Sequence, residues 1–162
     1  MRAKLKFVLM VVLLSVPAFA QNATRSGSDQ GAIVGLGQKA AVAALNFQQG
    51  DADGFTRARK DFTPDGWKNF VKSMEGFLDE KGAPTFTSSF VAARDATVVD
   101  EKEGVVHIRI PGTLTQSSNL GKTTYKAAIE VYVLPNRAPG GRPIKIQRFE
   151  QITCAGASTA CQ

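Results

Sequence analysis

The chain has 162 residues, and its 20 Lys and Arg against 14 Asp and Glu give a formal charge of +6 at neutral pH. Hydrophobic residues make up 43% of it, and this length suits one domain with a core of its own. Three basic residues fall within residues 1–20, so the remainder carries only +3, which does not favour a nucleic-acid-binding protein, and it has no apolar run long enough for a transmembrane span.

Residues 1–20 have the pattern of a secretory signal peptide. Basic residues precede an apolar run at residues 7–16, and Ala-Phe-Ala ending at Ala20 supplies a cleavage pattern before Gln21. The run is short for about 30 Å of hydrocarbon, so an uncleaved inner-membrane anchor is the minor alternative. We therefore expect export to the periplasm, cleavage between Ala20 and Gln21, and a disordered mature N-terminus over residues 21–29, where polar residues predominate.

Three helical segments open the single α+β domain that we expect over residues 30–153. Residues 30–49 have helical periodicity and many small side chains, which predicts a close contact between this helix and a sheet. A short helix is expected over residues 54–60, with Arg57 and Arg59 on its outer side.

The third helix, expected over residues 61–78, has the most complete set of signals. Thr63 can cap its first turn, and Pro64 can occupy the first helical position, where a missing N–H costs nothing. The Gly-Ala-Pro sequence that starts at Gly82 predicts its end near residues 79–81. Its apolar residues recur at the spacing of one buried stripe, which we expect to face the concave side of a sheet: Trp67, Phe70, Val71, Met74, Phe77 and Leu78.

After Gly82 the hydrophobic period changes to two, which predicts a β-meander. Four strands are expected, over residues 85–99 with a bulge near Ala92 and Ala93, 105–115, 122–134 and 142–152, with a charged turn at residues 100–104. Helices followed by an antiparallel meander predict an α+β domain in which a curved four-stranded sheet wraps the helix that carries Trp67.

Both cysteines lie in the C-terminal tail, residues 154–162. Small residues, Ala-Gly-Ala-Ser-Thr-Ala, separate Cys154 from Cys161 and can turn sharply. In an oxidising compartment we expect a disulfide between them that closes the tail and stabilises the fold near the lower end of the usual range of about 2–4 kcal/mol.

The sequence motifs do not predict catalysis, a metal site or a bound cofactor. The single histidine, His107, lies in an expected strand with no second His or Cys at ligand spacing, and we interpret it as a half-exposed strand residue. Residues 121–123 lack the earlier Gly of a phosphate-binding loop, and Gly35 and Gly37 follow no strand, which argues against nucleotide binding. We therefore predict that the protein is not an enzyme and holds no cofactor.

Basic residues gather on the short helix and around the last expected loop, where Arg57, Arg59, Arg137 and Arg142 provide a candidate partner surface. Binding of nucleic acid would also need exposed aromatic side chains. The aromatic residues here fall mostly on faces that we expect to be buried. We therefore interpret the basic residues as solvated side chains or as contacts for an acidic partner protein.

The sequence Phe-Thr-Pro-Asp-Gly-Trp-Lys-Asn-Phe at residues 62–70 follows two helices and resembles the aromatic block of the IcmL/DotI family of type IVB secretion and conjugation proteins. The resemblance reaches back through Phe47 and, more loosely, forward to about Phe149. The residues that form the core of this family signature are Phe47, Phe62, Thr63, Pro64, Gly66, Trp67 and Phe70.

This resemblance implies a nuclear transport factor 2-like, or cystatin-like, fold and a non-enzymatic periplasmic role in a type IV secretion or conjugation machine. The implied partners are other machine proteins in the periplasm or inner membrane, and a homo-oligomer is compatible with it. Two alternatives stay open. The cavity of such a fold can hold a small molecule, in a binding module or an enzyme, and an exported domain with a disulfide can be a secreted inhibitor or an immunity-type protein.

Overall fold

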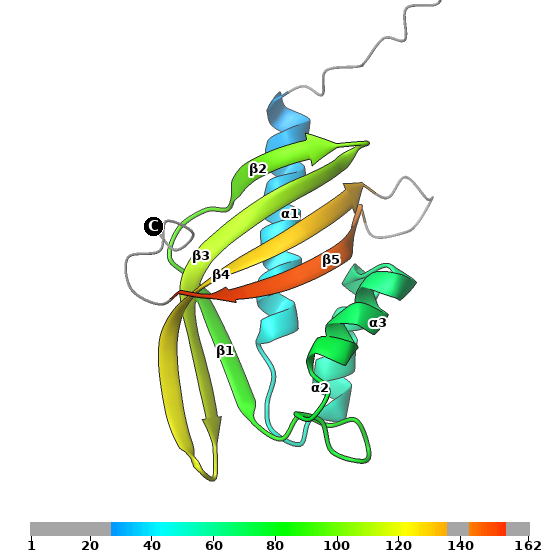
Figure 1. Ribbon diagram of the computed structural model, residues 1–162. Helices are drawn as coiled ribbons and strands as arrows, with labels where there is room; N and C mark the ends of the chain where they lie inside the picture. Colours follow the sequence, from blue (N-terminus) through cyan, green and yellow to red (C-terminus); the bar gives the residue numbers. More distant parts are fainter. Residues whose placement is uncertain (1–26, 136–142, 155–162) are drawn as a thin grey trace, which may run out of the picture.

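The helices of this chain cover one face of a curved antiparallel sheet. The computed structural model (Figure 1) describes residues 27–135 and 143–154, in which three α-helices and one 3-10 helix precede five strands. The helices are α1 Gly27–Leu45, α2 Ala52–Thr56, η1 Arg57–Asp61 (the 3-10 helix) and α3 Pro64–Ser73. The strands are β1 Thr87–Ala92, β2 Thr97–Lys102, β3 Val105–Ser118, β4 Gly121–Pro135 and β5 Ile144–Thr153. Figure 1 shows α1 behind the sheet and α3 beside β5.

The strand β3 connects the other strands of the sheet. Along one edge it pairs with β4, which in turn pairs with β5. On its other edge, β1 pairs with residues 112–117 and β2 with residues 105–109. The sheet therefore has five strands instead of the expected four, because the segment 85–99 forms two strands that share one edge of β3.

The chain leaves the edge of β3 between β1 and β2, in place of the expected bulge. The Ala93 N–H still donates to the Pro111 carbonyl, but the Ala96 N–H donates to the side-chain oxygen of Gln38 on α1 at 2.8 Å. This hydrogen bond to α1 thus fixes the segment that connects β1 to β2. The register shift of this edge lies further on, within β2 at Val99.

The turn between β2 and β3 is shorter than the charged turn expected over residues 100–104. Only Glu103 and Gly104 lie between the two strands, with φ of 53° and 79°. These left-handed values suit a two-residue hairpin turn. Asp100 therefore belongs to β2, and it lies opposite His107 on β3.

Alternating residues of β3 and β4 fill the core beneath the helices. The fully buried residues of these two strands on this face are Val106, Ile108, Ile110, Leu114, Ala127, Ile129, Val131 and Val133. The helix α1 packs closely on them, because a Cβ at Gly37 would lie 2.8 Å from a Val133 methyl group. The small side chains of residues 30–49 predict this close contact of a helix with the sheet.

The helix α3 begins where the sequence predicts. The Thr63 hydroxyl accepts a hydrogen bond from the Gly66 N–H at 3.0 Å, and Pro64 is the first helical residue. Phe70 is buried with 2% of its surface exposed, whereas Trp67 is only half-buried against the core.

The same helix ends earlier than expected, at Ser73 instead of residues 79–81. Gly76 adopts a φ of 87° and turns the chain, which a residue with a side chain rarely does. Phe77, expected on the buried stripe, therefore lies beyond the helix and is 54% exposed.

Candidate functional site

Aromatic residues of the 62–70 block gather between α3 and β5. The rings of Phe62 and Phe70 stack with centroids 5.2 Å apart, and the Trp67 ring lies 5.5 Å from that of Phe62. Phe70 meets Phe149 of β5 edge to face at 5.1 Å. These aromatic contacts tie α3 to the last strand of the sheet.

Phe47 joins this cluster through the ring of Phe55 on α2. The Phe55 centroid is 5.4 Å from that of Phe47 and 5.8 Å from that of Phe70. The structure therefore brings together all four aromatic residues to which the family resemblance points. Three of them are buried and Trp67 is half-buried, so the block holds α2 and α3 on the sheet.

The backbone of the block also docks on β5. The Thr63 N–H donates to the Ile146 carbonyl at 2.9 Å, and Phe62 forms a parallel bridge with the same residue. At Gly66 the helix approaches so closely that a Cβ would lie 2.4 Å from the Ile146 oxygen and 2.9 Å from the Gln147 oxygen. This close approach requires a residue without a side chain, which explains the glycine in the block.

A cleft of about 620 Å³ opens beside the aromatic cluster. Phe70 and Met74 form its wall on the α3 side, Tyr125 of β4 forms another, and residues 149–152 of β5 form a third. The half-exposed ring of Phe77 also lines it. This cleft is where a small molecule would lie under the binding-module alternative.

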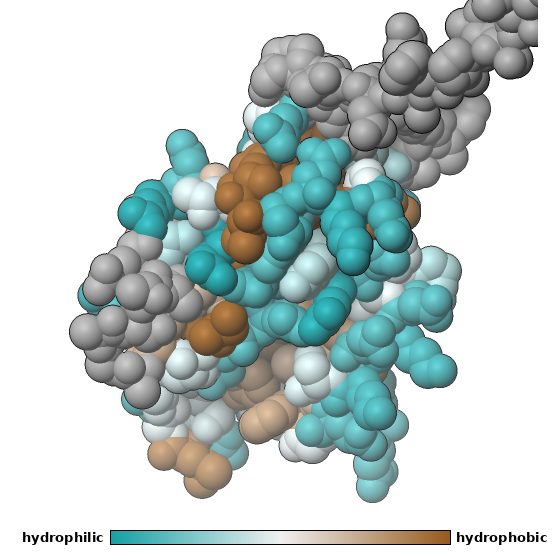
Figure 2. Space-filling view, turned by 45° about the horizontal axis from the view of Figure 1, so that its top comes forward, coloured by the Kyte–Doolittle hydropathy of each residue, from teal (hydrophilic) through white to brown (hydrophobic). Residues whose placement is uncertain are grey.

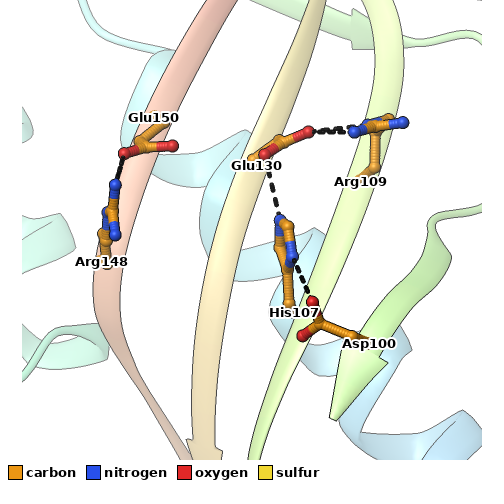
Figure 3. A network of polar contacts seen from close by, with 6 residues as sticks. All are labelled: Asp100, His107, Arg109, Glu130, Arg148 and Glu150. Carbon is orange, nitrogen blue, oxygen red and sulfur yellow. Dashed lines mark hydrogen bonds and ion pairs between the residues drawn. The ribbon is translucent and has the colours of Figure 1, made fainter. Parts of the chain in front are cut away.

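The outer face of the sheet carries a charged network that the sequence patterns did not predict (Figure 3). His107 lies between two carboxylates, with Nε2 3.0 Å from Glu130 Oε2 and Nδ1 3.6 Å from Asp100 Oδ2. Arg109 donates to the other Glu130 oxygen from Nε at 2.7 Å and from Nη2 at 2.5 Å. The His107 ring also stacks on Tyr132, with centroids 4.2 Å apart and an angle of 9° between the planes.

His107 is only 6% exposed, so its interpretation as a half-exposed strand residue is wrong. Alternation along β3 correctly predicts that His107 and Arg109 share one face. The pairing of β3 with β4, which sets Arg109 opposite Glu130, depends on a register that no local pattern reveals. Because Arg109 and His107 occupy both oxygens of Glu130, this carboxylate has little capacity left to act as a base.

The network gives Glu130 a pH-dependent contribution to stability. Burial raises the pKa of its carboxyl group, but the hydrogen bonds and charges of Arg109 and His107 outweigh burial, and the pKa lies below its ordinary value. A lowered folded-state pKa stabilises the fold above the ordinary pKa, and this contribution is lost as the pH falls below about 5. Glu130→Gln should therefore lower the free energy of unfolding by about 1–3 kcal/mol at neutral pH. The difference between variant and parent should shrink at acidic pH.

Urea unfolding of parent and variant across this pH range measures the effect of Glu130. Glu103→Gln, at the exposed turn, is the matched control for the loss of one negative charge. A Glu130→Gln difference that stays constant from neutral to acidic pH would contradict the assignment of this carboxylate to the network.

The basic residues expected at a partner surface are described only in part. Arg57 is exposed and pairs with Asp51 at 3.5 Å, and Arg59 is exposed on the same short helix. Arg137 and Arg142 lie outside the described residues. Figure 2 shows hydrophilic side chains over much of the visible surface, with hydrophobic residues in small separate patches.

The expected cleavage site, Ala20 and Gln21, and one cysteine, Cys161, also lie outside the described residues, so cleavage and the disulfide stay predictions. Cys154 is described, and its N–H donates to the Lys126 carbonyl of β4 at 3.1 Å. Within residues 27–135 and 143–154, no helix is long and apolar enough to cross a membrane. The same residues hold no group of three side chains that could bind a metal ion.

The fold is similar to those of domains from type IV secretion proteins. An IcmL-like type IV secretion system protein of Legionella pneumophila matches with a TM-score of 0.66 and 12% identity, over 83% of this chain and 99% of that chain. The periplasmic domain of DotI matches with a TM-score of 0.62 and 20% identity, over 80% of this chain and 97% of that domain. CagV, a VirB8 homologue of Helicobacter pylori, matches with a TM-score of 0.53 and 9% identity, over 72% of this chain and 93% of CagV.

No family model and no curated protein matches the sequence. The structural likeness agrees with the resemblance carried by residues 62–70, and it extends over almost the full length of the IcmL-like and DotI structures. The chain therefore has the nuclear transport factor 2-like α+β fold that the IcmL-like protein and the periplasmic domain of DotI share.

Proposed function

We propose that this chain is a non-enzymatic periplasmic component of a type IV secretion or conjugation machine, with a role similar to that of IcmL/DotI domains. The observation that carries the proposal is the likeness in fold, which covers 99% of the IcmL-like protein and 97% of the DotI domain. Its partners are then other proteins of the machine in the periplasm or inner membrane.

The position of the charged network supports a role in interaction over one in catalysis. The network lies on the outer face of the sheet, on the side opposite the helices, and His107, Arg109 and Glu130 do not line the aromatic cleft. Its central carboxylate, Glu130, is already bonded by Arg109 and His107. Charged groups that bond to each other in this way stabilise a surface, whereas catalytic groups need a free position for substrate.

The exported form should begin at Gln21 and contain a disulfide between Cys154 and Cys161, because the leader pattern is complete and the periplasm is oxidising. Intact-mass spectrometry of periplasmic protein tests both features. Cleavage gives the mass of residues 21–162, and a disulfide gives a gain of two hydrogens on reduction. Protein that retains residue 1 and fractionates with the inner membrane would restore the anchored alternative. Two thiols that are alkylated without reduction would rule out the disulfide.

Affinity capture from cross-linked cell envelopes tests the proposed function. A tagged copy in the native host should co-purify with membrane proteins of the machine, and deletion of the gene should abolish transfer of DNA or effector proteins. The double variant Arg57→Glu and Arg59→Glu should weaken capture if these residues contact an acidic partner. Lys68→Glu with Lys72→Glu, on the exposed side of α3, reverses the same number of charges and is the matched control. Unchanged transfer after deletion, with no machine protein captured, would reject the function.

The aromatic cleft favours a second candidate, a small-molecule binding module. Its volume of about 620 Å³ and its walls of Phe70, Met74 and Tyr125 suit a mostly apolar ligand. Native mass spectrometry of protein purified from its host should then reveal a co-purified small molecule. Met74→Trp, which fills the cleft, should remove that molecule.

A further inference from the structure

The edge of β5 beyond α3 carries no backbone partner in the described part of the chain. One side of β5 pairs with β4, and on the other side the Thr63 N–H donates to the Ile146 carbonyl. No other strand joins that side along residues 148–153 within the described ranges. An unpaired strand edge presents a row of hydrogen-bonding groups that can pair with another chain.

The direction of these groups follows from the end of the strand. The Cys154 N–H donates to the Lys126 carbonyl on β4, and hydrogen-bonded and non-hydrogen-bonded positions alternate along an antiparallel pair. The backbone groups of Phe149, Gln151 and Thr153 therefore point away from β4. Their N–H and C=O groups form the open edge.

The aromatic cleft runs along this open edge. Residues 149–152 are successive in the chain, and all of them line the cleft. Successive side chains of a strand point to opposite faces of the sheet. A cleft that touches all four residues therefore opens along the backbone edge, and Figure 1 shows this edge of β5 between α3 and the long β3–β4 hairpin.

The cleft is also elongated. It shares Phe77, Phe86 and Gln116 with a second hollow of about 490 Å³, which reaches Leu120 in the β3–β4 turn. Phe77, 54% exposed, and Leu120, 98% exposed, are exposed apolar side chains at its two ends, and the residues between them are mostly neutral and polar. A small molecule would fill one hollow, whereas an extended chain can occupy both.

The walls of the two hollows favour an uncharged occupant. Glu150 is the one side chain among the lining residues that is charged at neutral pH, and it accepts a hydrogen bond from Arg148 at 2.7 Å. The nearest polar groups are neutral, since the Gln151 amide donates to the Tyr125 hydroxyl at 3.1 Å. Apolar and neutral side chains are therefore the ones that this surface accepts.

We propose that residues 148–153 accept an extended segment of a partner protein as an added β-strand, with alternate apolar side chains of that segment in the cleft. Backbone hydrogen bonds to Phe149, Gln151 and Thr153 hold the segment, and the aromatic walls select its side chains. The inference rests on the proposed function only for the existence of a partner protein in the cell envelope.

Short linear peptides displayed on phage and selected against the purified full chain test this site. Gln151→Pro removes an outward N–H and keeps the ladder to β4, whereas Gln151→Ala keeps the N–H. Both variants lose the side-chain bond to Tyr125, so they form a matched pair. Enriched peptides should carry apolar residues at alternate positions and bind Gln151→Pro about tenfold more weakly than Gln151→Ala.

Thermal melts of the two variants check that the sheet is intact. Phe77→Ser provides a second test if Gln151→Pro fails to fold. The Phe77 ring is already half-exposed and lies outside the β4–β5 ladder, so its loss should weaken peptide binding and leave the sheet intact. Equal binding to both Gln151 variants, or a selection that enriches no peptide, overturns the proposal.

Three further results reassign the site or separate it from the function. A dimer of the parent that Gln151→Pro dissociates would assign the edge to a second copy and overturn the proposal. A small molecule bound equally by both Gln151 variants, without any peptide, would do the same in favour of a ligand. Peptide binding as expected, together with envelope capture that yields no machine protein, would reject the proposed function and support the site.

Discussion

Phe70→Ala should lower the free energy of unfolding by roughly 3–5 kcal/mol, the range for removal of a buried aromatic ring. Phe70 is 2% exposed, and its ring lies within 6 Å of those of Phe55, Phe62, Trp67 and Phe149. Its removal leaves a cavity at the junction of α2, α3 and β5. Since a domain is held together by only about 5–15 kcal/mol, urea unfolding should show a large shift in midpoint or no folded protein.

Two neighbours of Phe70 provide the comparison. Asn69→Ala, on the exposed side of α3, should stay within about 0.5 kcal/mol of the parent. Trp67→Ala should fall between the two, because this ring is half-buried and part of its surface already faces water. A Phe70→Ala protein as stable as Asn69→Ala would show that the aromatic cluster does not hold α3 on the sheet.

Gly66→Ala should destabilise the protein, although alanine is the better helix former. The added Cβ would meet the Ile146 oxygen at 2.4 Å and the Gln147 oxygen at 2.9 Å, which are backbone atoms of β5 and cannot rotate away. The helix must therefore move off the strand, at a cost of about 1–3 kcal/mol or more, as for other overpacked sites. Thermal melting should detect a loss of that size as a clear decrease in Tm.

The opposite sign is expected at another helical glycine. At Gly35 in α1, a Cβ would have no atom within 4 Å apart from the adjoining residues and backbone of its own helix. Gly35→Ala should therefore stabilise the protein by up to about 1 kcal/mol through helix propensity alone. If both substitutions change stability in the same direction, the close approach of α3 to β5 is not what constrains Gly66.

The start of α3 could be predicted from the sequence and its end could not. Thr63 and Pro64 act through bonds within the first turn, so local sequence is enough to predict them. At the other end two stop signals compete, Gly76 and Gly82, and both adopt positive φ in the structure. The apolar residues after Gly76 continue the helical spacing, which conceals the earlier stop.

The division of residues 85–99 into β1 and β2 depends on a contact far away in the sequence. The Ala96 backbone N–H donates to the side-chain oxygen of Gln38 on α1, and no strand pattern reveals this bond. The same limit applies to the pairing of Arg109 with Glu130, which needs the register of β3 against β4. Alternation predicts the face of each residue, and register decides which residues meet there.

The strand β5 is contacted by both α1 and α3 in the described residues, and it comes last among the described elements. A chain that emerges from a ribosome or a membrane channel with its N-terminus first can form the β3–β4 hairpin early, because the paired residues are close in sequence. Its helices have no complete surface to pack on until residue 153 has emerged. Vectorial folding of this domain therefore finishes only after β5 has emerged, and until then the preceding residues lack part of their packing surface.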